Sequence, residues 1–239
     1  MAKADNHKVS SFAKLHERLS EFRDDHGWMF RGHRDAAWPL VPKAGRSPFF
    51  RANEELFFNA WKRRAIAHIP SGPRTDWDWL TVAQHHGLST RLLDWSGNPM
   101  TGAYFAVLGE TGTDAALYAF KPKFEAPVDK ADSPYDVKPG IVNLRPSAFV
   151  ARVSSQLSRF TLHNPPTSDL AGQTKYGPLN KIIVEARYVR ELRIELDYYG
   201  YNAATIFPDL DGLSTHLNWI GSQQDLRREL LDQEKQSRP

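Results

Sequence analysis

The sequence contains no cysteine, so disulfide bonds, thiolate metal sites and cysteine nucleophiles are all excluded. It has no apolar run close to the roughly 18 residues that a membrane-spanning helix requires. The opening stretch, MAKADNHKVSSF, carries charged residues but lacks the apolar segment of a signal peptide. These absences predict a cytoplasmic protein with no membrane partner.

Several motifs that carry common chemistries are also missing. The phosphate-binding GxxxxGKS/T loop, the dinucleotide-binding GxGxxG turn, the zinc-binding HExxH helix and the GxSxG nucleophile turn are all absent. The nine histidines do not fall at positions i and i+4 with a carboxylate. The sequence therefore disfavours P-loop and zinc-hydrolase chemistry, and we expect no metal site.

The residues that are present describe a folded protein with a mild basic excess. The 239 residues are 41% hydrophobic and 12% aromatic, with seven tryptophans, which is enough for a sizeable core. The net charge of +3 and a pI of about 9.0 favour anionic partners such as nucleotides or nucleic acid. An ordinary soluble protein with spare lysines would show the same balance.

Hydrophobic periodicity predicts alternating helices and strands. We expect helices over 10–26, 49–69, 76–87, 98–110 and 189–200, a helix within 147–160, and a last helix after 207–212. We expect strands over 28–32, 114–122, 141–144, 160–164 and 181–186. With no repeat and no linker, this order predicts a single α+β domain over 1–239, with a mixed or antiparallel sheet and flanking helices. Its core would span about 10–221, and 222–239 would form a frayed tail.

Local signals add detail to these helices. Expected caps are Ser10 or Ser11, Thr75 or Asp76, and Asn98 followed by Pro99. Apolar side chains expected to point inward are Phe57, Trp61 and Ile66 in the second helix, and Leu192, Leu196 and Tyr199 in the helix over 189–200.

The densest polar signal lies in AQHHGLSTRLLDWSGNPMTGAYFAV, residues 83–107. Within fourteen consecutive positions, this segment contains six polar residues: His85, His86, Thr90, Arg91, Asp94 and Asn98. Because buried polar groups must be hydrogen-bonded, Arg91 and Asp94 could pair with each other, and Asn98 could simply cap its helix. His85 stands at a helix end, where it either favours the helix dipole or leans into a cleft. Leu92, Leu93 and Trp95 should be core.

A second signal is FRG, residues 30–32, followed closely by Arg34, Lys43 and Arg46. Arginine grips phosphate or carboxylate through two parallel hydrogen bonds, and glycine lets a ligand approach the backbone. On this interpretation, lysine in place of Arg31 would keep the fold and lose binding. The alternative is an arginine that reaches from a strand to a surface carboxylate.

A third signal is FPDLDG, residues 207–212. It lacks the further ligands of a calcium loop, so we expect Asp211 to cap the last helix. Asp209 would then be a free acid in the cleft.

Together these three signals resemble the FRG domain family, which is named for its F/Y-Arg-Gly motif. The family pattern places FRG before QHxGxPTRLLDWTxNPxxAxxFA and a later LFPDLDGLA-like segment; here these read FRGHRDAAWPLVPKAGR, QHHGLSTRLLDWSGNPMTGAYFAV and IFPDLDGLSTHL. Ser89 replaces the usual proline and Ser96 the usual threonine. The resemblance places eight residues on family positions: Arg31, His85, Thr90, Arg91, Asp94, Asn98, Asp209 and Asp211.

The same segments have a weaker resemblance to ADP-ribosyltransferases, although no Glu-x-Glu is present. That resemblance implies an ADP-ribosyltransferase-like fold and NAD as the cofactor, held by Arg31, Gly32, Thr90, Arg91, Tyr104 and Phe105. It implies a catalytic set of Arg31, His85, Thr90 and one acid, with Glu185, Asp209 and Asp211 as candidates. The FRG family occurs in bacteria and phages near mobile elements, which implies a toxin or phage-defence effector acting on nucleic acid or protein.

Three functions remain open on the sequence. The first is the NAD-dependent enzyme, for which Arg31, His85, Thr90, Arg91, Asp94 and Asp209 should converge on one cleft. The second is a non-enzymatic nucleotide- or nucleic-acid-binding module, with Trp28 and Trp38 as stacking surfaces beside a patch of Arg31, Arg34, Lys43, Arg46 and Arg91. The third is a metal-dependent nuclease that uses His85, Asp94, Asp209 and Asp211.

Overall fold

The structure, a computed structural model, describes residues 8–69, 73, 75–109, 111–145 and 158–236. The chain forms two compact units, Met1–Arg193 and Ile194–Pro239. The single domain expected over 1–239 stays a prediction. Among the described helices, none combines the length and the apolar composition that a transmembrane span needs.

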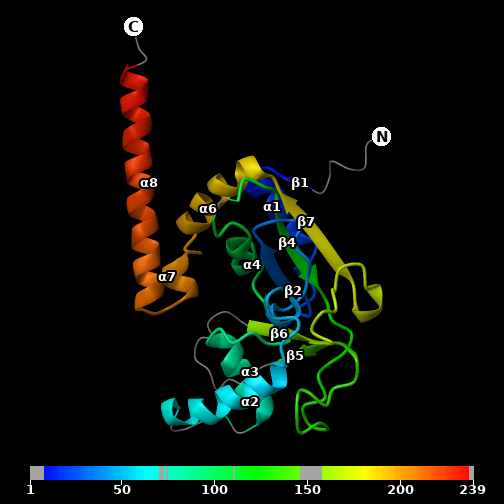
Figure 1. Ribbon diagram of the computed structural model, residues 1–239. Coiled ribbons are helices and arrows are strands. Elements are labelled where there is room, and N and C mark those ends of the chain that lie inside the picture. The colour runs from blue at the N-terminus through cyan, green and yellow to red at the C-terminus, as the bar shows by residue number, and fades with distance from the viewer. Residues whose placement is uncertain (1–7, 70–72, 74, 110, 146–157, 237–239) are drawn as a thin grey trace. The chain divides into compact units, whose positions relative to one another are not determined.

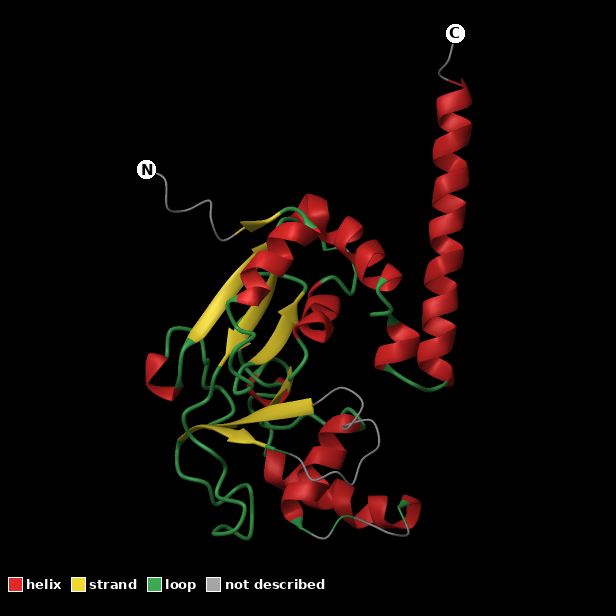
Figure 2. Cartoon of the chain, turned by 180° about the vertical axis from the view of Figure 1, so that it is seen from behind, coloured by secondary structure: helices red, strands yellow, loops and turns green. Residues whose placement is uncertain are grey.

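The first unit contains a seven-stranded mixed sheet (Figures 1 and 2). Its strands are β1 (Lys8–Val9), β2 (Met29–His33), β3 (Leu92–Ser96), β4 (Ala115–Phe120), β5 (Gly140–Leu144), β6 (Ser158–Asn164) and β7 (Leu179–Val184). They lie in the order β1-β7-β4-β2-β3-β6-β5, and every pair is antiparallel except β1 with β7. The predicted α+β class with a mixed sheet and flanking helices is confirmed.

Four helices of this unit have the caps that their sequences indicate. They are α1 (Phe12–Ser20), α2 (Glu54–Ala65), α3 (Asp76–His85) and α4 (Pro99–Ala106). Side chains of Ser11, Thr75 and Asn98 accept hydrogen bonds from backbone N–H groups in the first turns of α1, α3 and α4. These three predicted caps are confirmed, and Asn53 caps α2 in the same way.

The helices are shorter than predicted, and for α1 and α2 the structure shows a local cause. α1 ends at Ser20 instead of residue 26, and the turn that follows is held by Asp25, whose Oδ1 accepts from the Gly27 N–H at 2.7 Å. Such short side-chain bonds compete with helix continuation. α2 starts at Glu54 rather than residue 49, because Asn53 provides the cap.

The predicted inward face of α2 is correct for Trp61 and wrong for Phe57 and Ile66. Phe57 and Ile66 are 56% and 58% exposed, whereas the neighbouring Phe58 is 1% exposed. Phe58 and Ala65 lie seven residues apart on one helix face, and Trp61 packs partly buried against the same cluster. Because Leu56, Phe57 and Phe58 are all apolar, the sequence does not determine which of them lies on the buried face of the helix. Tertiary packing buries Phe58.

Two apolar clusters lie on opposite faces of the sheet. One joins α2 and α3 to β3, β5 and β6, and its largest members include Phe58, Trp79 and Leu162; Figure 1 shows these helices beside β5 and β6. The other joins Trp95 and Met29 to side chains from the loops after β2 and after β6. Alternation along β3 sends Leu92 to the first cluster and Leu93 and Trp95 to the second. All three are buried, as the sequence predicts.

Helix α4 packs directly on β2, and two glycines make this possible. A Cβ on Gly32 would lie 2.1 Å from the Ala106 nitrogen and 2.2 Å from the Gly102 oxygen. A Cβ on Gly102 would lie 2.9 Å from the Phe30 Cβ. Gly32 is therefore needed for the approach of a helix, which corrects the expectation that it admits a ligand to the backbone.

Helix α6 (Val189–Tyr198) contains the boundary between the units, and the second unit also holds α7 (Ala203–Ile206) and α8 (Leu210–Gln236). Leu192 and Leu196 are fully buried as predicted, whereas Tyr199 follows the helix and is 59% exposed. The predicted tail is part of α8 as far as residue 236. The helix expected within 147–160 falls largely outside the described residues.

The start of α8 corrects the prediction for FPDLDG. Asp209 directly precedes the helix, and its Oδ1 accepts from the Gly212 N–H at 2.7 Å. Asp209 therefore caps α8, and Asp211 lies inside the first turn. A carboxylate in either position stabilises the positive end of the helix.

Candidate functional site

The sheet is split between β2 and β3, and Arg31 lies at the split. β2 pairs with β4 over five residues but with β3 only through Phe30 and Ser96. One position beyond that pair, Arg31 Nη1 donates a hydrogen bond to the Asp94 carbonyl oxygen at 2.7 Å. A side chain thus joins the two halves of the sheet where the backbone ladder stops.

Arg31 is also held from its own strand. Its Nε–H donates to Nε2 of His33 at 2.9 Å, so His33 is neutral and carries its proton on Nδ1. Burial, followed by the nearby Arg31 charge, lowers the pKa of His33 to about 3. The two side chains share one face because they lie two residues apart on a strand.

Asp94 presents a partly exposed carboxylate beside this arginine. Its side chain is 57% exposed, and its Oδ2 lies 3.8 Å from Arg31 Nη1. Gln84 Nε2 donates to both carboxylate oxygens at 3.0 Å, and Gln84 Oε1 accepts from the Thr90 hydroxyl at 2.6 Å. Asp94 therefore pairs with Gln84 and Arg31, and the predicted pairing with Arg91 is wrong.

Free hydrogen-bonding capacity remains at this point. Arginine has five N–H groups, and both of those on Nη2 of Arg31 have no acceptor among the described residues. Arg46 lies close enough to lower the pKa of Arg31 and His33. It is exposed, and its guanidinium makes no ion pair or hydrogen bond within the described part of the chain. We call Arg31, His33, Arg46, Gln84 and Asp94 the Arg31 cluster.

Two residues expected to bind cofactor are committed to the fold. Thr90 is fully buried, and its hydroxyl also accepts from the Leu92 N–H at 3.1 Å. The Arg91 Nε donates to Glu54 Oε2 at 3.0 Å, and the Arg91 backbone N–H donates to Glu54 Oε1 at 2.6 Å. The Arg91 guanidinium also lies 4.3 Å from the centre of the Tyr135 ring. Both partners of the ion pair are at most 10% exposed, which suits a structural brace.

The other predicted residues of this segment lie on α3 and α4. His85 ends α3, with its ring 5.2 Å from that of His86. Tyr104 is buried within α4 and Phe105 is partly buried. Asn98 caps α4 through a bond to the Met100 N–H at 2.9 Å, as expected for a structural role.

The predicted acid Glu185 does not lie beside Arg31 in the sheet. Arg31 pairs with Tyr118 and Tyr118 with Lys181, so Glu185 lies two strands away and four residues further along. These offsets put its backbone roughly 16 Å from that of Arg31. Glu185 follows β7 and pairs with Arg187. Asp209 and Asp211 belong to the second unit.

In the described residues, no group of three His, Asp or Glu side chains is arranged to hold a metal ion. Of the residues named for a metal-dependent nuclease, His85 and Asp94 belong to the first unit, and Asp209 and Asp211 belong to the second. Among them, only Asp94 belongs to the Arg31 cluster.

A buried polar network beside the cluster was not foreseen. Trp95 Nε1 donates to the Thr161 hydroxyl at 3.0 Å, which lies 2.9 Å from His163 Nε2. His163 Nδ1 lies 2.7 Å from the Ser168 carbonyl oxygen, so Nδ1 carries the proton and Nε2 accepts from Thr161. Burial lowers the pKa of His163 to about 4.

Sequence reasoning also overlooked His33 and Gln84. The i, i+2 spacing of Arg31 and His33 on a predicted strand would have placed them on one face. Gln84 opens the QHxGxPTRLLDW family motif, but its spacing alone does not indicate its partners, which come from β3 and from the turn before it.

The fold and the cluster define an α+β protein with a split mixed sheet and a charged site at the split. Residues 26–115 match the family model of the FRG domain, and this range contains all five residues of the Arg31 cluster. The chain therefore contains an FRG domain. No curated protein and no solved structure matches the chain significantly.

Proposed function

We propose that the FRG domain binds NAD at the Arg31 cluster and transfers its ADP-ribose group to an acceptor, as an ADP-ribosyltransferase-like enzyme. One observation carries this proposal: Arg31, whose Nη2–H groups have no acceptor among the described residues, lies beside an exposed carboxylate that Gln84 holds in place, and Arg46 adds a positive charge that acts on Arg31. NAD has the complementary charges, since its diphosphate is anionic and its nicotinamide ring is cationic.

Arg31 and Arg46 supply the anion-binding part. Guanidinium groups bind phosphate oxygens through charge-assisted hydrogen bonds, and the Nη2 edge of Arg31 is available for them. His33 supports this arrangement because a neutral imidazole fixes the Arg31 Nε–H without adding a like charge.

In this proposal Asp94 is the catalytic acid, in place of the candidates Glu185, Asp209 and Asp211 that the sequence suggested. When the bond between the nicotinamide nitrogen and ribose C1′ breaks, nicotinamide leaves with the electron pair and C1′ becomes cationic. A fixed carboxylate next to C1′ stabilises that charge. The acceptor oxygen or nitrogen then bonds to C1′ and releases its proton to solvent.

The acceptor is part of the proposal, as nucleic acid or protein in a bacterial toxin or phage-defence setting. The net charge of +3 favours an acidic acceptor. Charge supports the class of acceptor and not its identity.

The experiment compares NAD binding and nicotinamide release in wild type and three charge variants. Arg46→Gln should weaken NAD binding by at least about tenfold, because one charge-assisted contact is lost. Asp94→Asn should leave NAD binding within about threefold and lower turnover by about 100-fold. Arg187→Gln, which removes an equal charge from an exposed arginine paired with Glu185, should match wild type.

Three results would contradict the proposal. Wild type that neither binds NAD nor releases nicotinamide rejects the function. Equal NAD affinity in wild type and Arg46→Gln rejects the site, and full turnover in Asp94→Asn rejects the acid. Arg31→Lys is a poor test, because lysine cannot make both bonds of this largely buried side chain and the fold itself should weaken.

A further inference from the structure

A basic pocket lies in the first unit, where the turn after α1 meets the ends of several strands. It has a volume of about 490 Å³, within the range of small-molecule sites. The turn after α1, the start of α4 and the ends of β5 and β6 form its walls. The residues that carry the argument below are Phe22, Asp25, Trp28, Arg145 and Arg159, and we call this site the Arg159 pocket.

Two arginines of the pocket face each other across neighbouring strands. Leu144 pairs with Phe160, so the next residues in the antiparallel register are Arg145 and Arg159. Like charges in opposed positions destabilise a sheet, and a bound anion between them would remove that cost. Arg23 adds a third guanidinium among the lining residues.

Among the described residues, no carboxylate forms an ion pair with Arg159. Its Nη2 donates to the His26 carbonyl oxygen at 3.2 Å, which is a neutral acceptor. Burial and then the nearby Arg145 lower the pKa of Arg159, and the Glu125 carboxylate opposes this shift. Arg145 pairs with Glu125 at 3.3 Å in an exposed contact that an incoming anion can replace.

The carboxylate of the pocket is already occupied. Asp25 is the only acidic residue among the described residues that line the pocket, and it forms an ion pair with Lys121. Hydrogen bonds from Lys121 and from the Gly27 N–H lower the pKa of Asp25. The pocket therefore keeps a positive balance.

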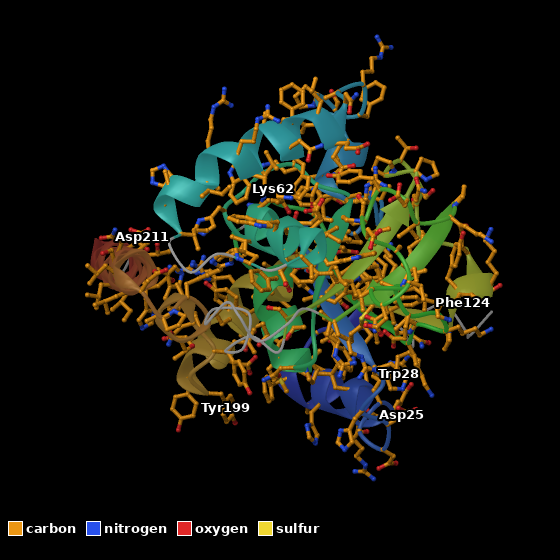
Figure 3. The ribbon with its side chains drawn as sticks, turned by 90° about the horizontal axis from the view of Figure 1, so that it is seen from below. Asp25, Trp28, Lys62, Phe124, Tyr199 and Asp211 are labelled. Atoms are coloured by element: carbon orange, nitrogen blue, oxygen red, sulfur yellow. The ribbon has the colours of Figure 1, made fainter. Side chains whose placement is uncertain are left out.

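The apolar wall of the pocket is aromatic. Trp28 is half-buried, with its ring centre 4.8 Å from that of Phe22 in an edge-on arrangement. Phe22 in turn packs edge-on against Phe30 at 5.9 Å. Figure 3 shows Trp28 next to Asp25 on the turn that follows α1. Because this contact is edge-on, it leaves a face of the Trp28 indole on which a planar ring can stack.

We propose that the Arg159 pocket binds a nucleoside phosphate, with its phosphate on Arg159 and Arg145 and its base against Trp28. Guanidinium pairs recognise phosphate, and base–aromatic stacking is the common partner of such contacts. The ligand is either a free nucleotide or a nucleotide of a single strand. The inference does not rest on the proposed NAD chemistry, because no residue of the Arg31 cluster lines this pocket.

Calorimetric titration with four probes tests the inference. The probes are AMP, adenosine, inorganic phosphate and a short single-stranded oligodeoxyadenylate, all at low salt. AMP or the oligonucleotide should bind clearly more tightly than adenosine and phosphate, because only they present a base and a phosphate together. Tighter binding of AMP identifies a free nucleotide, and tighter binding of the oligonucleotide identifies a strand.

Three variants locate the binding. Arg159→Gln and Trp28→Leu should each weaken the preferred probe by about tenfold or more. Arg145→Gln changes a side chain that is 67% exposed, so it tests the anion contact without risk to the fold. Arg187→Gln is the matched control and should bind like wild type.

Several results would overturn the inference. One is that neither AMP nor the oligonucleotide binds, and another is that Arg145→Gln and Arg159→Gln bind as wild type does. A third is that the Arg46→Gln variant no longer binds AMP while the Arg159→Gln variant binds it as wild type does. That result would assign the nucleotide to the Arg31 cluster. Loss of NAD turnover in Asp94→Asn with unchanged AMP binding would leave both proposals standing, so the two fail separately.

Discussion

Acidification should destabilise the protein through two buried histidines, His33 and His163. Both are neutral in the folded state, with pKa values lowered to about 3 and about 4, whereas an unfolded histidine has a pKa of about 6.5. Between pH 6.5 and 4, each of these histidines is therefore protonated in the unfolded chain but neutral in the folded protein. Stability is fully present above pH 6.5 and is lost as the pH falls through that window.

The size of the effect follows from the two shifts. Each histidine contributes at most about 1.4 kcal/mol per pH unit inside the window. From pH 7 to pH 5 this amounts to about 2 kcal/mol for each histidine and about 4 kcal/mol for both. Because His33 is 4% exposed and His163 is not exposed, solvent screening reduces these figures little.

Urea unfolding at pH 7, 6 and 5 measures the effect. Carboxylates also begin to titrate near pH 5, so the informative quantity is the difference between variants. His163→Gln can keep a donor to Ser168 and an acceptor for Thr161, and should lower the pH slope of the unfolding free energy by one proton. His86→Gln, at an exposed position, should keep the wild-type slope. Equal slopes for all three proteins would refute the assignment of a neutral buried His163.

Two further predictions concern packing. Gly32→Ala should destabilise the protein by more than the roughly 1–3 kcal/mol of ordinary overpacking, because the new Cβ would lie 2.1 Å from the backbone of α4; a wild-type melting temperature would contradict this. Glu54→Gln should cost about 3–5 kcal/mol by leaving the Arg91 charge buried and uncompensated. The double variant Glu54→Leu with Arg91→Met should recover most of that loss in urea unfolding, and a purely additive result would count against the brace.

Local sequence chemistry was sufficient for several features of the fold. Ser11, Thr75 and Asn98 cap their helices because a short oxygen-bearing side chain before an amphipathic run has backbone N–H groups within reach. The strand at Met29–His33 and the buried Trp95 follow from dense apolar and aromatic residues.

The partners of charged residues could not be predicted in the same way. Arg91 and Asp94 lie three residues apart, and pairing them was the natural local choice. In the structure, Arg91 pairs with Glu54, 37 residues away in sequence, and Asp94 is hydrogen-bonded to Gln84, 10 residues away. Spacing along the chain does not state which helix packs over a strand, and that packing decides which opposite charge is near.

The sequence by itself determined the FRG motif, the α+β class and the presence of an arginine at the end of an apolar run, because these depend on residue type and on period along the chain. Only the tertiary structure decided what that arginine does. The ladder between β2 and β3 ends after Phe30 and Ser96, and this split places Arg31 against the Asp94 carbonyl, with its Nε–H bonded to His33. The role of Gly32 was likewise decided by the approach of α4. Such contacts join residues that are distant in sequence, so their energies depend on the packed arrangement of elements that no local pattern encodes.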